Sequence, residues 1–217
     1  MVLTQDNIIE RIKKGEIAFS PKLDKFQMQP HSIDLRLGHS FHLPTSWQMT
    51  EKGRVALHID PLENDVSNFE QIILKDGQFF ELLPNEYIVA TTMEKIMLNA
   101  DDIMGVLFPR SSVTRRGLAI KLTGLIDVGY CGYLMIPIMN NTHNQIIRVY
   151  PGERICSVLF EELSSPISKD RALIHGVTKA KYMNNEVGFI GSKTDKQVEI
   201  DMIKHGKIKQ LKKEYKV

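Results

Sequence analysis

The sequence has few cysteines and no long hydrophobic run. Its two cysteines, Cys131 and Cys156, are too few for a disulfide framework and show no CxxC spacing for a metal knuckle. We read both as small buried residues in a reducing compartment. No stretch approaches the roughly eighteen apolar residues that a membrane span needs, and MVLTQDNIIERIKKGE lacks the apolar run of a signal peptide. We therefore expect a cytoplasmic protein without a membrane partner.

Several common catalytic motifs are also absent. The chain has no GxxxxGK[ST] phosphate loop, no GxGxxG turn, no GxSxG elbow and no HExxH pair. It lacks the HxE and PCxxC segments with which zinc-dependent nucleobase deaminases hold a metal-bound water. These absences exclude the corresponding chemistries.

The charge is balanced overall but uneven along the chain. A net charge of +2, with 42% hydrophobic and 25% charged residues over 217 positions, fits a single globular domain with appendages. Residues 193–217 contain eight lysines and four acids. We interpret this segment as a solvated tail and do not expect a nucleic-acid partner, although a phosphate-binding role stays open.

The hydrophobic pattern predicts a mainly β protein. Residues 4–14 form a short amphipathic helix behind Thr4 as N-cap, with Gly15 as its stop. From about 17 to 165 the sequence consists of short apolar runs separated by Pro, Gly, Asn and Asp, which is typical of a sandwich or barrel. We expect a β domain over 1–165 with a peripheral insertion at 44–76, followed by a polar C-terminal arm over 166–217 whose residues 196–214 form a helix.

One polar island follows a predicted strand at PRSSVTRRGL, residues 109–118. It places arginines and hydroxyls close together, which suits a chain of phosphate oxygens. The residues are Arg110, Ser111, Ser112, Arg115 and Arg116. A polar turn with surface arginines is the alternative interpretation.

A second island is TGLIDVGYCG, residues 123–132, which delivers Asp127 into a turn rich in glycine. Glycines allow the backbone to approach a ligand, and the free backbone groups of a hairpin can bind the edge of a base. Asp before a glycine is also a common turn residue, so this alternative stays open.

In their order these islands resemble the dUTPase/dCTP deaminase superfamily. The segments that carry the resemblance, from residue 3 to about 197, are LTQDNIIERIKKGEIAFSP, QPHSIDLRLGHSF, the stretch ending in FPRSS, IDVGYCG, YPGERICSVLFEEL and AKYMNNEVGFIGSKTDK. The resemblance implies a distorted jelly roll that forms a homotrimer. It also implies sites between subunits, an arm that closes over the nucleotide, and Mg²⁺ on the phosphates.

The resemblance also assigns roles to residues. Asp127 is the expected general base and Tyr130 lies under the deoxyribose. Asp34 is expected to hold magnesium through water, with an ion pair to an arginine as the alternative. The expected substrate-binding residues are Arg110, Ser111, Ser112, Arg115, Gly124, Ile126, Tyr130, Arg154, Lys181, Tyr182, Asn185, Phe189 and Ser192. Arg115 is alternatively a trimer-interface residue.

Pro137 weighs against one of the two reactions of the superfamily. Pro137 stands where the zinc-free deaminases carry a glutamate, and proline cannot transfer a proton. We therefore expect hydrolysis of dUTP to dUMP and pyrophosphate. The alternatives are a dCTP deaminase, with or without the hydrolytic step, that uses another acid, and a non-catalytic nucleotide-binding regulator. Gly129, Ser157 and Asn185 also depart from the family pattern.

Overall fold

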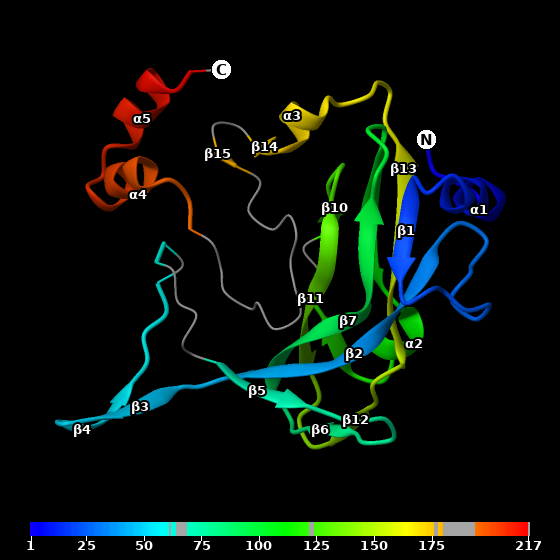
Figure 1. The fold of residues 1–217 in the computed structure, drawn as a ribbon. Helices are drawn as coiled ribbons and strands as arrows, with labels where there is room; N and C mark the ends of the chain where they lie inside the picture. Colours follow the sequence, from blue (N-terminus) through cyan, green and yellow to red (C-terminus); the bar gives the residue numbers. More distant parts are fainter. Residues whose placement is uncertain (61, 64–68, 122–123, 176–177, 180–193, 217) are drawn as a thin grey trace.

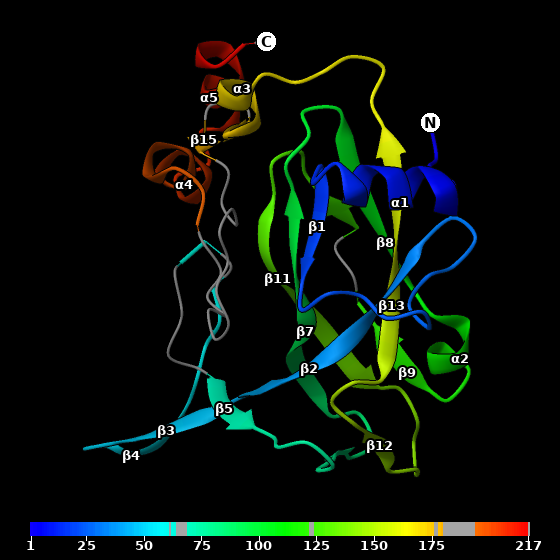
Figure 2. The ribbon, with the colours of Figure 1, turned by 45° about the vertical axis from the view of Figure 1, so that its right-hand side comes forward.

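The structure is a computed structural model that describes residues 1–217 except 61, 64–68, 122–123, 176–177, 180–193 and 217. Most of its strands belong to one antiparallel sheet of nine strands that curls around a core, as Figures 1 and 2 show. The main path of the sheet runs β10–β8–β13–β2–β7–β11–β9, with β1 added to β7 and β5 added to β2. The predicted all-β fold is confirmed.

The strands of this sheet are short at its edges and long at its centre. In chain order they are β1 (Ile17–Ser20), β2 (Ile33–Pro44), β5 (Phe69–Ile73), β7 (Tyr87–Leu98), β8 (Ile103–Pro109), β9 (Leu118–Ile120), β10 (Leu125–Ile126), β11 (Cys131–Asn140) and β13 (Arg154–Glu162). The described residues also form three two-stranded ribbons: β3 (Trp47–Thr50) with β4 (Gly53–Ala56), β6 (Phe80–Leu82) with β12 (Ile147–Val149), and β14 (Ile174–His175) with β15 (Thr178–Lys179).

The predicted N-terminal helix is α1 (Gln5–Lys13), which lies beside β1 in Figure 2. Thr4 is its N-cap and forms a capping box with Asn7, so backbone donors at the helix start are satisfied. Ile8 is fully buried and joins the helix to the core. Gly15, with φ of 74°, follows the helix end as expected.

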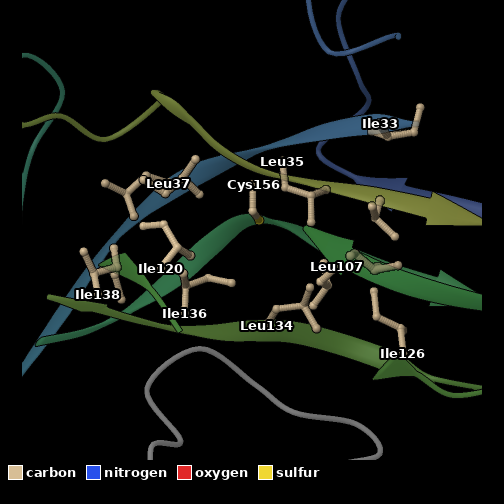
Figure 3. Close-up of a cluster of buried hydrophobic side chains, with 14 of the residues drawn as sticks. Ile33, Leu35, Leu37, Leu107, Ile120, Ile126, Leu134, Ile136, Ile138 and Cys156 are labelled. Carbon is tan, nitrogen blue, oxygen red and sulfur yellow. The ribbon is translucent and has the colours of Figure 1, made fainter. Parts of the chain in front are cut away.

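The core fills the inside of the curled sheet mainly with Ile and Leu side chains, several of which are labelled in Figure 3. β11 shows the period of two that produces it: Leu134, Ile136 and Ile138 are buried, and the residues between them are half-exposed. The outward positions of β11 are Cys131, Tyr133, Met135, Pro137 and Met139. Cys156 is buried as expected and burial raises its pKa to about 12, whereas Cys131 is half-exposed.

The C-terminal region departs from the sequence expectation, because it forms two helices in place of one. These are α4 (Gln197–Lys204) and α5 (Ile208–Glu214), and Gly206 between them has φ of 70°. Lys204 Nζ lies 3.1 Å from Asp60 Oδ2 and 2.8 Å from Glu63 Oε1, so the tail contacts the predicted insertion. No helix in the described part of the chain has the length and apolar character that a membrane span requires.

Candidate active site

Two of the predicted phosphate-binding arginines meet at a buried carboxylate. Asp34 lies on β2, Arg154 begins β13 and Arg110 follows β8, and β13 pairs with both of the other strands. Asp34 Oδ2 is 3.0 Å from Arg110 Nε and 3.2 Å from Arg154 Nη1. Ser157 Oγ donates a hydrogen bond of 2.6 Å to Asp34 Oδ1. The strand order therefore assembles this cluster from residues that are far apart in the sequence.

This arrangement holds two guanidinium groups in fixed positions at the edge of the core. The Asp34 side chain is 4% exposed, whereas those of Arg110 and Arg154 are 23% and 30% exposed. Arg110 also donates from Nη1 to the carbonyl oxygen of Arg154, over 2.9 Å. One negative charge thus offsets the repulsion between two cations whose outer parts stay accessible to an anion. Such a pair suits phosphate oxygens.

The other residues of the phosphate-binding prediction lie next to this cluster. Ser111 and Ser112 begin the short helix α2 (Ser111–Thr114), for which Arg110 is the N-cap. Both serines are exposed, and so is Arg115 at the end of the helix. Within the described residues none of the three side chains makes a hydrogen bond or ion pair that would fix its role, so their part in substrate binding stays a prediction.

Asp34 forms ion pairs with arginine, which is the alternative role that the sequence left open. Both of its oxygens are engaged by Ser157, Arg110 and Arg154. Within the described residues no three His, Cys, Asp or Glu side chains gather into a metal site. The described groups around Asp34 are two guanidinium groups and a serine hydroxyl. They do not form the set of oxygen ligands that a magnesium site built by the protein alone requires. A magnesium role for Asp34 stays a prediction.

Asp127 lies just after β10, in a turn closed by a hydrogen bond from Tyr130 N to Asp127 O. Its side chain is 51% exposed, and its Oδ2 atom is 3.6 Å from Nε2 of His175 on β14. Gly124 precedes β10 with φ of 96° and accepts a hydrogen bond from Leu107 N, while Ile126 is buried. Sequence reasoning missed His175, because no motif links two positions so far apart.

Tyr130 packs into the core instead of standing open to a ligand. It is 8% exposed, and its hydroxyl donates a hydrogen bond of 2.9 Å to the carbonyl oxygen of Tyr133. Burial raises the pKa of the phenol well above its usual value. A contact with deoxyribose stays a prediction.

One copy of the chain does not bring Asp127 and Arg110 together. In the pairing of β10 with β8, Ile126 lies opposite Gly105 and Leu125 opposite Val106. Asp127 is therefore near the start of β8, whereas Arg110 follows its end. A strand rises by about 3.3 Å per residue, so the length of β8 separates Asp127 from Arg110 by about 20 Å. The predicted base and the predicted phosphate site belong to different ends of the strand.

No acidic residue occupies the outward face of β11. At the position where the resemblance places a glutamate, Pro137 pairs with Val89 of β7, and its carbonyl oxygen accepts a hydrogen bond from Lys121 N. The predicted arm residues lie outside the described part of the chain: Lys181, Tyr182, Asn185, Phe189 and Ser192. They stay predictions.

Comparisons with known proteins connect this site to one family. A family model described as dCTP deaminase-like matches residues 2–163. A protein named "dCTP deaminase, dUMP-forming" from Dictyoglomus thermophilum is 34% identical over 169 residues, which cover 76% of this chain and 82% of the relative. A protein of the same name from Methanosphaera stadtmanae is 32% identical over 210 residues, which cover 95% of this chain and 99% of the relative.

A solved structure agrees with the fold. The 2'-deoxycytidine 5'-triphosphate deaminase from Agrobacterium tumefaciens superposes with a TM-score of 0.55 at 23% identity. The match covers 75% of this chain and only 49% of that chain.

The relatives correct our preferred reaction. Dictyoglomus and Methanosphaera proteins similar over most of this chain are named for deamination of dCTP with formation of dUMP, whereas the sequence argument favoured hydrolysis of dUTP alone. Pro137 does not outweigh the likeness of the whole chain to these relatives. A missing acid at one backbone position excludes that side chain but does not exclude a proton carrier from another element. The chain belongs to the dCTP deaminase-like family.

Proposed function

We propose that the protein binds dCTP and converts it to dUMP, ammonia and pyrophosphate. The observation that carries this proposal is the pair of arginines, Arg110 and Arg154, fixed by the buried Asp34 within a chain similar to dUMP-forming dCTP deaminases. Two oriented guanidinium groups bind the triphosphate that both halves of the reaction share.

The conversion consists of two hydrolytic steps that balance without a redox partner. Water adds to C4 of the cytosine ring and the amino group leaves as ammonia, which gives dUTP. A second water attacks the α-phosphorus of dUTP, and pyrophosphate leaves dUMP behind. Asp127, a half-exposed carboxylate, is the proposed base that orients and deprotonates this second water. Pro137 requires that the proton carrier for the first step come from another side chain.

The distance between Asp127 and Arg110 leads to a second part of the proposal. A base and a phosphate site about 20 Å apart in one copy form one active site only if different copies contribute them. We place the site between subunits of a homotrimer, as the resemblance implies. Magnesium bound to the phosphate oxygens would neutralise charge there.

The test is a product analysis of the purified protein with dCTP and Mg²⁺. We expect ammonia, pyrophosphate and dUMP in equal amounts. Asp127→Asn should abolish dUMP formation while dCTP still binds, because the change keeps the shape of the side chain and removes the base. Asp101→Asn, which alters an exposed acid in the turn before β8, is the matched control and should keep activity.

A non-catalytic nucleotide-binding regulator is the second candidate, and Pro137 is the observation that favours it. The same experiment separates the two. Tight binding of dCTP without release of ammonia or pyrophosphate, at any magnesium concentration, would support the regulator and contradict the enzyme.

A further inference from the structure

We propose that His175 is a positioning residue that orients the carboxylate of Asp127. The inference deepens the proposed function and rests on it, because it concerns the base of the hydrolytic step. Its starting observation is the distance of 3.6 Å between His175 Nε2 and Asp127 Oδ2. No sequence motif connects the two residues.

The two side chains come from separate elements that the fold brings together. Asp127 follows β10 of the main sheet, and His175 ends β14 in the small ribbon β14–β15. β14 itself follows the short helix α3 (Lys169–Ala172), whose N-cap Ser168 accepts a hydrogen bond from Arg171 N. The contact therefore joins the start of the C-terminal arm to the turn that carries the proposed base.

Because both side chains are exposed, we assign their contact to orienting the Asp127 carboxylate and not to stabilising the fold. The side chains of His175 and Asp127 are 47% and 51% exposed. A polar contact this open to solvent adds little to folding free energy, because water competes with it and screens it. A contact that contributes little to stability still restricts the rotation of a carboxylate in an open turn.

Restricted rotation matters because a general base acts only from the correct geometry. The turn fixes the backbone of Asp127 through the hydrogen bond from Tyr130 N, but this bond leaves the side chain free to rotate. His175 Nε2 lies 3.6 Å from one carboxylate oxygen, Oδ2, and this contact limits the orientations that the carboxylate can take. This is the general arrangement in which a third group orients a catalytic base.

The activity test compares two substitutions at residue 175. His175→Leu removes the polar contact, and His175→Gln keeps a side-chain N–H that can reach the carboxylate. We expect kcat for pyrophosphate release from dUTP to fall about tenfold or more in His175→Leu and to recover to within about threefold in His175→Gln, with KM nearly unchanged. His143→Gln, at an exposed histidine between β11 and β12, is the control.

Unchanged kcat in His175→Leu would overturn the proposal. A rise in KM at constant kcat would also overturn it, because it would indicate a role of the arm in binding alone.

A second measurement does not depend on turnover. The imidazole ¹H–¹⁵N signals of His175 should shift in Asp127→Asn, while those of the other histidines stay in place. If wild-type protein released neither ammonia nor pyrophosphate, the proposed function would fail. The His175 signals would still test whether His175 and Asp127 are in contact. Unmoved His175 signals would contradict the inference whatever the activity.

Discussion

Asp34 shows how a single buried carboxylate sets the geometry of a binding site. It accepts from Ser157 and pairs with Arg110 and Arg154, so three strands depend on it. Removing its charge leaves two guanidinium groups close together without compensation. The residue therefore affects folding stability and anion binding through the same contacts.

We predict that Asp34→Asn lowers the free energy of unfolding by about 3 kcal/mol and weakens dCTP binding. Chemical denaturation and isothermal calorimetry measure the two effects. The matched control is Asp24→Asn, which removes an Arg36 partner whose side chain is 45% exposed, and it should change both values little. Equal effects of the two substitutions would contradict the assignment of Asp34.

His42 is a second residue whose burial has a measurable consequence. It is 2% exposed, its Nε2 atom is 3.0 Å from Ser40 Oγ, and Gln71 Nε2 donates to the same hydroxyl. Burial lowers the pKa of the imidazole below its ordinary value of 6.5. The folded protein thus favours the neutral form of His42 more strongly than the unfolded chain does.

The lowered pKa of His42 makes the stability of the protein depend on pH. Below about pH 6.5 the unfolded chain protonates His42 and the folded chain resists, so stability is lost as pH falls. We predict that the wild-type melting temperature drops more between pH 7 and pH 5 than that of His42→Gln. His143→Gln, at an exposed site, should keep the wild-type dependence. Parallel curves for wild type and His42→Gln would count against this prediction.

At the scale of elements, the close contact of β2 and β7 requires a glycine. A Cβ atom at Gly38 would lie 2.7 Å from Thr91 Oγ1 and 2.8 Å from Thr92 O. The register between the two strands shifts in this region, between Leu37 and Phe41. The backbones approach there more closely than a side chain allows.

We predict that Gly38→Ala destabilises the protein by about 2 kcal/mol, because β2 and β7 must separate to accept the methyl group. A shift of the urea unfolding midpoint measures the effect. An unchanged midpoint would show that the strands move apart without cost.

The helices and strands differ in how well the sequence predicted them. The helix over 4–14 and the strand-rich region from about 17 to 165 agree with the sequence expectation, because capping and hydrophobic periodicity are local properties. The break of the C-terminal helix at Gly206 was not expected. A single glycine inside a helical pattern is tolerated in many helices, and only the chain path after α4 required a positive φ there.

At the scale of the whole molecule, the outward face of β11 bears on assembly. Its half-exposed side chains include Tyr133, Met135, Pro137 and Met139, which are apolar or mainly apolar. They neighbour Val89 and other residues of β7 across the sheet. An apolar sheet face of this kind favours burial against further copies of the chain.

We predict a trimer with a mass of about 74 kDa, three times the 24.8 kDa of one chain. Met135→Glu should shift the protein toward monomer, because it places a charge in the proposed interface. Met49→Glu, on the exposed β3–β4 ribbon, is the control and should keep the trimer. Light scattering after size-exclusion chromatography measures the masses, and a monomeric wild type would contradict the prediction.

The sequence alone determined the family resemblance, the all-β class and the arginine and aspartate positions, because motif spacing and periodicity are written along the chain. It did not determine the reaction, since a residue missing from one position says nothing about groups that other elements supply. Only the tertiary structure decided that Asp34 pairs with Arg110 and Arg154, that Tyr130 is buried, and that His175 meets Asp127. These contacts join residues distant in the chain, and they exist only once strand order and register are set.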